Sequence, residues 1–173
     1  MDYDIIVLGG GPGGYVSAIR ASKLGLKVAV VEKNDLGGIC CNWGCIPTKS
    51  LLHNAYVLDL VKNSKKFGID IPSYKIDWKK VIKRSRDVAK RLNKGIEYLL
   101  NKNNIDYIPH YGKMFDKNTV LLDDNKKIKS KFTVIATGGK SKQIPGIEFD
   151  SSSVISSREA MNLSEIPKEL IIV

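Results

Sequence analysis

The sequence has no apolar run close to the roughly 20 residues that cross a bilayer, and 27% of its 173 residues are charged. These features argue against a membrane protein. The start, Met1-Asp2-Tyr3-Asp4, lacks the basic residues and cleavage pattern of a signal peptide, so we expect a cytoplasmic protein. No internal repeat or low-complexity tract occurs, and the 43% hydrophobic content is enough for one domain with a core.

Histidine is scarce as well, with two residues, His53 and His110, beside three cysteines. A tetrahedral metal site needs four good ligands. The adjacent Cys40 and Cys41 do not easily share one ion, and His53 is the one histidine near them. We therefore predict no metal site.

Acidic residues are fewer than basic ones, and the net charge of +10 raises the possibility of nucleic-acid binding through the basic stretch Lys79–Lys94. Aromatic residues do not alternate with these bases as in a stacking platform. Asp77 can cap a helix there, and apolar residues recur at helical spacing, which predicts a solvated basic face; a membrane-surface helix is equally unsupported. The apolar positions are Val81, Ile82, Val88, Ala89, Leu92, Ile96 and Leu99.

Glycine is abundant near the start of the chain, in a pattern that predicts nucleotide binding. An apolar strand over Tyr3–Leu8 runs into a glycine turn and then a helix over Tyr15–Leu24; a second strand, Lys27–Val31, ends at Glu32. This order is that of a dinucleotide fingerprint, in which the turn approaches a pyrophosphate and a carboxylate about 20 residues later binds a ribose. The fingerprint glycines are Gly9, Gly11 and Gly14.

All three cysteines lie in the next stretch, Gly37–Lys49. In a regular helix residues five apart are displaced by about 7.5 Å along the axis, whereas a disulfide tolerates Cα atoms up to about 6.8 Å apart. Cys40 and Cys45 could therefore bridge only across a distorted turn, for which Gly44 supplies freedom. Pro47 suits the first turn of a following helix, whose N-terminus would favour a thiolate at Cys45. The alternative is a set of inert, buried thiols.

The sequence Gly37-Gly38-Ile39-Cys40-Cys41-Asn42-Trp43-Gly44-Cys45-Ile46-Pro47-Thr48-Lys49 resembles the redox-disulfide signature of the flavin-dependent pyridine-nucleotide disulfide oxidoreductases. The resemblance implies that Cys40 and Cys45 form the redox pair. Cys40 would be the interchange thiol that meets a dithiol substrate, and Cys45 would exchange electrons with the flavin. Cys41 would be extra, at a position where an apolar residue is usual.

The fingerprint alone does not distinguish FAD from NAD. In this family a glycine fingerprint that is followed directly by the cysteine pair binds FAD. Two later features also resemble the family: Gly112, which would lie near the adenine or be an ordinary turn glycine, and the motif Val134–Gly138. The resemblance implies FAD contacts at Gly9, Gly11, Pro12, Gly13, Gly14, Glu32, Lys33, Gly38, Ile39, Cys40, Lys49, Gly112, Ala136, Thr137 and Gly138.

The expected fold is α/β, a Rossmann-like FAD-binding domain whose parallel sheet and helices carry a small antiparallel β-meander. Residues 1–150 would form this domain, and residues 151–173 a linker and the first strand, Pro167–Val173, of an NAD-binding domain. The meander would comprise Ile105–Pro109, Lys113–Phe115, Thr119–Leu122 and Lys127–Ser130, followed by a buried strand over Phe132–Ala136.

Within the family, Ile19 replaces an arginine and Thr48 a lysine of the glutathione-binding members, which favours the members that oxidise dihydrolipoamide with NAD. The resemblance then implies a homodimer and, as partner, the lipoyl domain of a 2-oxoacid dehydrogenase complex. Mercuric and other disulfide reductases remain alternatives, as does a flavin- or nucleotide-binding module without turnover. We expect the 173-residue chain by itself to have little NAD-linked activity, because it carries one glycine fingerprint.

Overall fold

A computed structural model describes residues 1–173, which form two compact units. The first unit comprises Met1–Asn42 and Lys90–Lys140, and the second comprises Trp43–Ala89 and Ser141–Val173. No helix is both long and apolar enough to cross a membrane.

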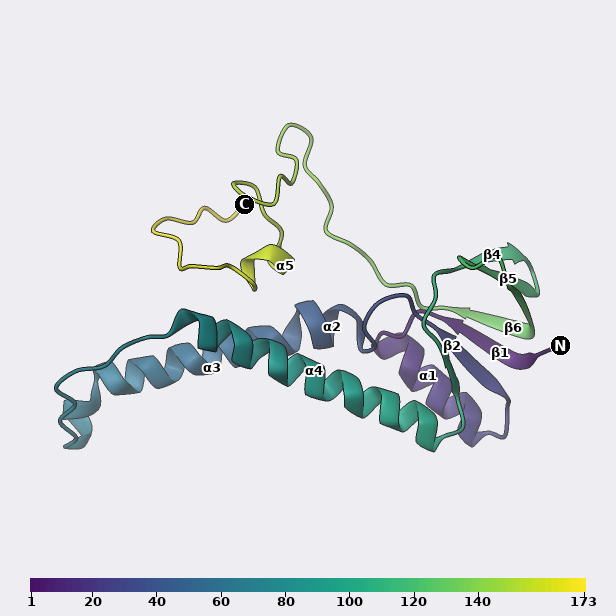
Figure 1. Ribbon diagram of the computed structural model, residues 1–173, viewed down its shortest axis with the longest axis horizontal. Helices are drawn as coiled ribbons and strands as arrows, with labels where there is room; N and C mark the ends of the chain where they lie inside the picture. The colour runs from purple at the N-terminus through teal and green to yellow at the C-terminus, as the bar shows by residue number, and fades with distance from the viewer. The chain divides into compact units, whose positions relative to one another are not determined.

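The first unit contains a six-stranded sheet in the order β3-β2-β1-β6-β5-β4 (Figure 1). The strands β1, β2, β3 and the second half of β6 are parallel, whereas β4, β5 and the first half of β6 form an antiparallel meander. This arrangement confirms the predicted α/β fold with a parallel sheet and a meander. The strands are β1 Tyr3–Leu8, β2 Val28–Val31, β3 Asp106–Ile108, β4 Gly112–Asp116, β5 Thr119–Leu122 and β6 Lys127–Ile135.

Apolar side chains of β1, β2 and β5 form a core between the strands and their neighbours. All four residues of β2 are buried, as expected for a strand covered on both faces. The core residues are Ile6, Leu8, Ala29, Val31, Val120 and Leu122.

Helix α1, Pro12–Lys23, packs against β1 and β2 (Figure 1). It begins three residues before the predicted start at Tyr15. Proline has no N–H and a fixed φ that suits the first helical position, and the N–H groups of Gly14 and Tyr15 both donate to Gly11 O. The glycine turn is therefore continuous with the helix.

Two predictions of how the strands are arranged were wrong, although strands form in the predicted segments. The segment Ile105–Pro109 does not begin the meander: β3 pairs in parallel with β2, through Ala29 with Asp106 and Val31 with Ile108. Buried Leu100 and Ile105 anchor the chain at this edge of the sheet. The segments predicted at Lys127–Ser130 and Phe132–Ala136 are one strand, β6, that pairs with β5 and then with β1.

The second half of β6 is also less buried than predicted. Phe132 and Ile135 are 68% and 69% exposed. This part of β6 pairs with β1, whereas β5 pairs with β6 only at Lys127–Lys129, so the residues from Phe132 to Ile135 have a strand partner on one side alone.

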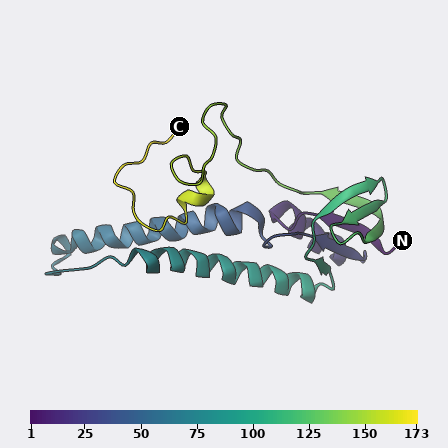
Figure 2. The same cartoon turned by 45° about the horizontal axis from the view of Figure 1, so that its top comes forward.

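The second unit is built on α3, Cys45–Lys62, and the first half of α4, Trp78–Lys102, which run side by side in both views (Figures 1 and 2). Arg84 Nη1 donates to Ser50 Oγ at 3.0 Å between them. The remaining elements are α2 Gly38–Trp43, which spans the division between the units, the short 3₁₀ helix η1 Ser64–Phe67 and α5 Ser157–Ala160.

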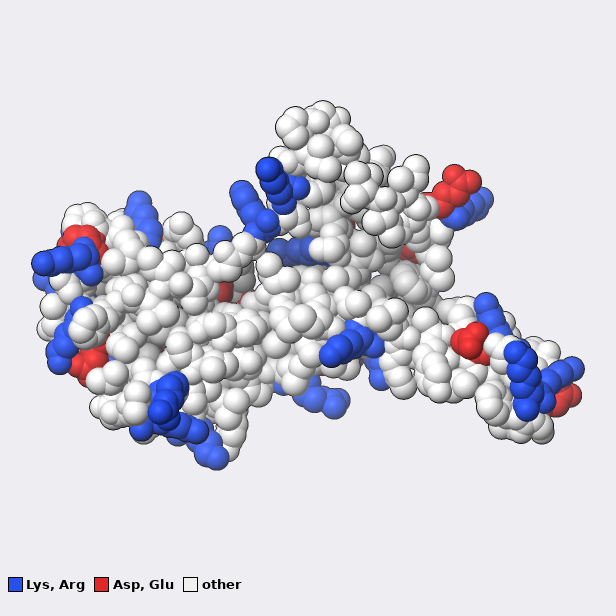
Figure 3. Space-filling model, turned by 180° about the vertical axis from the view of Figure 1, so that it is seen from behind, with Lys and Arg blue, Asp and Glu red and all other residues white.

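Asp77 precedes α4 as predicted, and its Oδ1 accepts a hydrogen bond from Lys80 N at 3.1 Å. That hydrogen bond lowers the pKa of Asp77. The basic residues of α4 are mostly exposed, and Figure 3 shows Lys and Arg in separate groups over the face that it presents, several with Asp or Glu beside them. The apolar face is shifted by one residue from the prediction near its end, because Leu100 is buried and Leu99 is 40% exposed.

Residues 167–173 form no strand in this structure, and Ile171 and Ile172 are 88% and 87% exposed. A strand needs a neighbour that pairs with its N–H and C=O groups. The six-stranded sheet ends at β3 and β4, and residues 167–173 are not among its strands. The assignment of 151–173 to a linker and a first strand of a second domain stays a prediction.

Two adjacent glycines of α1 provide a matched test of this packing. A Cβ on Gly14 would lie 1.8 Å from Gly9 O, whereas a Cβ on Gly13 would meet nothing within 4 Å. Gly14→Ala should lower the free energy of unfolding by at least the ~1–3 kcal/mol typical of overpacking. Gly13→Ala should be neutral or slightly stabilising, because alanine is the better helix former. Urea denaturation of both variants measures the difference, and equal stabilities would contradict this packing.

Candidate nucleotide and thiol site

Backbone atoms pack so closely around the glycine turn after β1 that there is no room for a side chain at Gly9. Gly9 has a φ of +103°, and a Cβ there would lie 2.2 Å from Ala136 O. Gly9 N donates to Val31 O at 2.8 Å, and Ala136 N donates to Leu8 O at 2.8 Å. The turn is therefore held between the ends of β2 and β6, the carboxyl edge of the parallel sheet, where ligands of such folds bind.

The N-terminus of α1 is open to an anionic ligand. Gly11 is the N-cap residue, no side chain caps the helix, and its first turn contains no acidic residue. Amide groups and the positive end of the helix dipole attract phosphate at such a terminus. The absent Cβ of Gly13 leaves space there. These features fit the diphosphate of a dinucleotide.

Glu32 follows β2, and the backbone holds both of its carboxylate oxygens. Gly10 N donates to Oε2 at 3.0 Å, and Asn34 N donates to Oε1 at 2.8 Å. Each oxygen keeps lone pairs that can accept from a ribose hydroxyl. The fingerprint carboxylate is thus fixed beside the glycine turn, as the sequence spacing predicted.

Two tyrosines contact the residues that follow Glu32. Tyr107 of β3 donates from its hydroxyl to Asn34 O at 3.3 Å. Burial raises the pKa of Tyr107, and the negative charge of Glu32 raises it further. Lys33 Nζ lies 5.1 Å from the ring centroid of Tyr111. Neither tyrosine was identified from the sequence, because no fixed spacing connects them to the fingerprint.

Gly112 begins β4 and packs on the core. A Cβ there would lie 2.9 Å from Val31 Cγ1 and 3.1 Å from Leu8 Cδ2. This close packing is a sufficient reason for glycine at this position. Proximity of Gly112 to an adenine stays a prediction.

The stretch that carries the thiols begins directly against the glycine turn. Gly37 N donates to Gly10 O at 2.8 Å, and a Cβ on Gly38 would lie 2.9 Å from Gly11 Cα. Both Gly37 and Gly38 have positive φ, at 89° and 57°. The first residue of α2 therefore touches the turn backbone to backbone, two residues before Cys40.

Two asparagines that the sequence analysis did not identify hold this loop. Buried Asn42 donates from Nδ2 to Leu36 O at 2.8 Å and to Gly38 O at 3.0 Å. Asn93 of α4 donates to the same Leu36 O at 2.9 Å. An asparagine between cysteines in a glycine-rich stretch is a signal for a side chain that satisfies loop carbonyls.

The three cysteines have different environments. Cys40 is half-buried on α2, Cys41 is buried, and Cys45 is the exposed first residue of α3. A Cβ on Gly37 would lie 2.8 Å from Cys41 Sγ and 2.9 Å from Ile96 Cδ1, so Cys41 fills a packed position. The regular helix is interrupted at Gly44, as a bridge between Cys40 and Cys45 would require. The bridge itself stays a prediction.

Tyr15 of α1 responds to the thiols of α2. Burial raises the pKa of Tyr15, and the charges of Cys41 and Cys40 raise it further.

The first unit therefore brings together the glycine turn, Glu32, Gly38 and Ala136. Pro12 is the first residue of α1, Ile39 is 54% exposed beside Cys40, and Thr137 and Gly138 follow β6. Cys45 and Lys49 belong to α3 in the second unit. The FAD contacts predicted for these residues stay predictions.

Residues 3–173 match the family described as pyridine nucleotide-disulphide oxidoreductase. The chain belongs to this family. The resemblance drawn from the thiol stretch is thereby confirmed.

Relatives named dihydrolipoyl dehydrogenase resemble almost the whole chain. The proteins of Chlorobaculum tepidum and Zymomonas mobilis are each 42% identical over 99% of this chain, which covers 37% and 38% of their lengths. The protein of Acholeplasma laidlawii is also 42% identical, and the chain covers 52% of it. The chain thus spans between about a third and a half of these oxidoreductases.

Glu32 provides a direct test of the nucleotide site. Glu32→Ala should weaken adenine-nucleotide binding by about 1.5–3 kcal/mol, the range for hydrogen bonds to a charged group. Glu32→Gln should cost less, because it keeps one carbonyl oxygen as acceptor. Isothermal titration of each variant with FAD measures the loss, and unchanged affinity in both would exclude Glu32 as the ribose ligand.

Proposed function

We propose that the protein to which this chain belongs is an FAD-dependent dithiol oxidoreductase that oxidises dihydrolipoamide to lipoamide with NAD as the final acceptor. The observation that carries the proposal is the contact of Gly37 and Gly38 with the turn residues Gly10 and Gly11. Cys40, two residues later, is then next to the diphosphate site, where a bound redox cofactor could exchange electrons with the thiol pair.

The residues present fit FAD. The backbone of the turn Gly9–Gly14 and the N-terminus of α1 would hold its diphosphate, and Glu32 would accept hydrogen bonds from its ribose. FAD, when bound, supplies the two-electron acceptor that no protein side chain provides. Lys33, Ile39, Lys49, Thr137 and Gly138 are proposed as further contacts from the family resemblance.

The sulfur chemistry is thiol–disulfide exchange between the substrate and a Cys40–Cys45 disulfide. One substrate thiolate attacks Cys40 Sγ, the Cys40–Cys45 bond breaks, and Cys45 leaves as a thiolate. The second substrate thiolate then attacks the substrate sulfur of the mixed disulfide and releases the Cys40 thiolate. The substrate loses two electrons and two protons and becomes a cyclic disulfide, and the protein disulfide gains the two electrons.

The position of Cys45 suits its role as a leaving thiolate. Cys45 begins α3, and the positive end of a helix stabilises a leaving thiolate. Relatives named dihydrolipoyl dehydrogenase and the residues Ile19 and Thr48 support dihydrolipoamide over glutathione as substrate. As partners we propose a lipoyl domain and a second copy of the complete protein, and as acceptor NAD.

The exchange half-reaction can be tested on this chain. We expect oxidised chain to contain a Cys40–Cys45 disulfide and a reduced Cys41, as peptide mapping under non-reducing conditions will measure. Addition of dihydrolipoamide should then produce one lipoamide and two protein thiols per disulfide, measured by chromatography and thiol titration.

Three serine variants are matched controls for this half-reaction. Cys40→Ser and Cys45→Ser should each abolish lipoamide formation, because each removes one half of the disulfide. Cys41→Ser should retain it, since Cys41 fills a packed position. A main disulfide that includes Cys41, or no lipoamide from a chain with the Cys40–Cys45 bond, would contradict the proposal and favour a module without turnover.

A further inference from the structure

The segment that includes α5 contacts residues on both sides of Cys45. Residues 156–163, called here the clasp, belong to the same unit as α3. The Arg158 guanidinium lies 4.3 Å from the ring centroid of Trp43, two residues before Cys45. Thr48, three residues after Cys45, donates from Oγ1 to Met161 Sδ at 3.6 Å. A third contact joins the clasp to α4, where Trp78 Nε1 donates to Leu163 O at 2.8 Å.

Trp43 is held from two sides. Arg86 of α4 lies 4.4 Å from the same ring centroid, so two guanidinium groups contact one indole. Arginine over tryptophan is a favoured cation–π arrangement. Burial lowers the pKa of Arg86, and the charge of Arg158 lowers it further, which agrees with two cations held close together.

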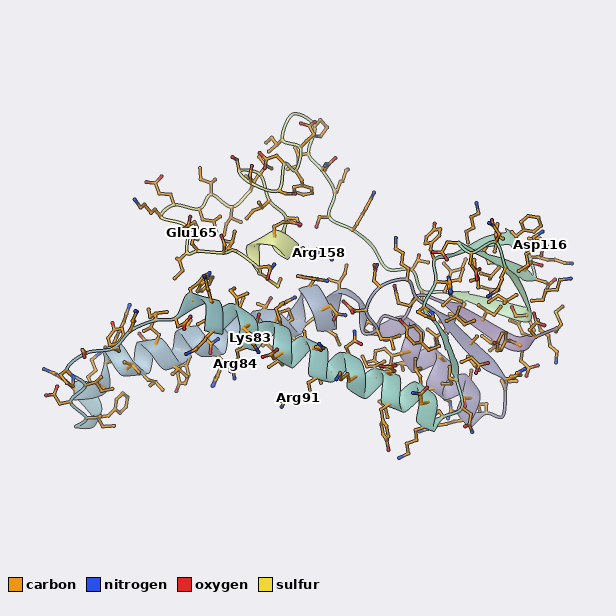
Figure 4. All side chains as sticks on the ribbon, in the orientation of Figure 1. Lys83, Arg84, Arg91, Asp116, Arg158 and Glu165 are labelled. Atoms are coloured by element: carbon orange, nitrogen blue, oxygen red, sulfur yellow. The ribbon has the colours of Figure 1, made fainter.

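The clasp is preorganised by its own hydrogen bonds. Ser156 and Glu159 form a capping box at the start of α5, in which Arg158 N donates to Ser156 Oγ at 3.2 Å and Ser156 N donates to Glu159 Oε2 at 2.9 Å. The Ser156 hydroxyl also donates to Glu159 Oε2. These hydrogen bonds hold the backbone that carries Arg158 (Figure 4).

We propose that Arg158 is a positioning residue for thiol chemistry at Cys45. The clasp restricts Trp43 and Thr48, and with them the turn that carries Cys45, so less conformational entropy is lost when Cys45 forms a disulfide. This inference rests on the proposed function, because it concerns the Cys40–Cys45 bond. Arg158 acts through Trp43 and needs no contact with substrate.

The test is the redox equilibrium of this bond against glutathione, in a Cys41→Ser background. Oxidised glutathione takes two electrons and two protons from the Cys40 and Cys45 thiols and becomes two reduced glutathione molecules, while the protein forms one disulfide. Arg158→Ala should lower the equilibrium constant for disulfide formation about twofold to fivefold, the factor that one cation–π contact at a partly exposed site supports. Arg158→Lys, which keeps a cation, should fall between.

Arg91→Ala is the matched control, because Arg91 is an exposed arginine of α4 whose loss removes the same charge (Figure 4). Its equilibrium constant should equal that of the parent. Acrylamide quenching of tryptophan fluorescence should increase in Arg158→Ala, because Trp43 and Trp78, the two tryptophans of the chain, both contact the clasp. A thermal melt of each variant separates this local effect from a general loss of stability.

The outcomes distinguish the inference from the function on which it rests. A parent that forms no Cys40–Cys45 disulfide overturns the proposed function and the role of Arg158 together. A parent that forms it, with an equilibrium constant equal to that of Arg158→Ala, overturns the role of Arg158 alone. An equally large decrease of the equilibrium constant in Arg91→Ala also overturns the role of Arg158, because the loss of any one positive charge would then explain the effect.

Discussion

The backbone contact between two glycine segments is the constraint on which the site depends. Gly37 N bonds to Gly10 O, and Gly38 packs on Gly11 so closely that a Cβ would lie 2.9 Å from its Cα. A side chain on Gly38 would collide with the backbone of the nucleotide turn, and a side chain on Gly37 would collide with Cys41 and Ile96. The glycines therefore do more than permit tight turns: they bring the start of α2 to the carboxyl edge of the sheet.

The packing around this contact separates the adjacent cysteines. Cys41 is buried, and a Cβ on Gly37 would lie 2.8 Å from its Sγ, whereas Cys40 is half-buried. Asn42 then satisfies the carbonyls of Leu36 and Gly38, which keeps the loop from needing water. The burial of Cys41 agrees with the inert-thiol alternative for that residue, and the reactive roles of Cys40 and Cys45 stay predictions.

Features with a fixed local spacing were predicted from the sequence. The strand β1, the glycine turn, the helix after it and Glu32 depend on neighbouring residues, and the structure has all four in the predicted order, with the helix beginning three residues early. The direction of β3 was not predicted, because a short apolar strand carries no signal for its partner. Within the first unit Asn93 and Tyr107 reach the site from distant parts of the sequence, and within the second unit Arg158 reaches Trp43 in the same way, so only the fold identifies these contacts.

The central claim is that the thiol of Cys40 is next to the bound dinucleotide, and protection from alkylation tests it most directly. The chain is mixed with iodoacetamide with and without saturating FAD, and modification of Cys40 is followed by mass spectrometry, with binding verified by fluorescence. We predict that FAD slows alkylation of Cys40 severalfold and that Glu32→Ala raises the FAD concentration required. Bound FAD with an unchanged rate at Cys40 would contradict the account.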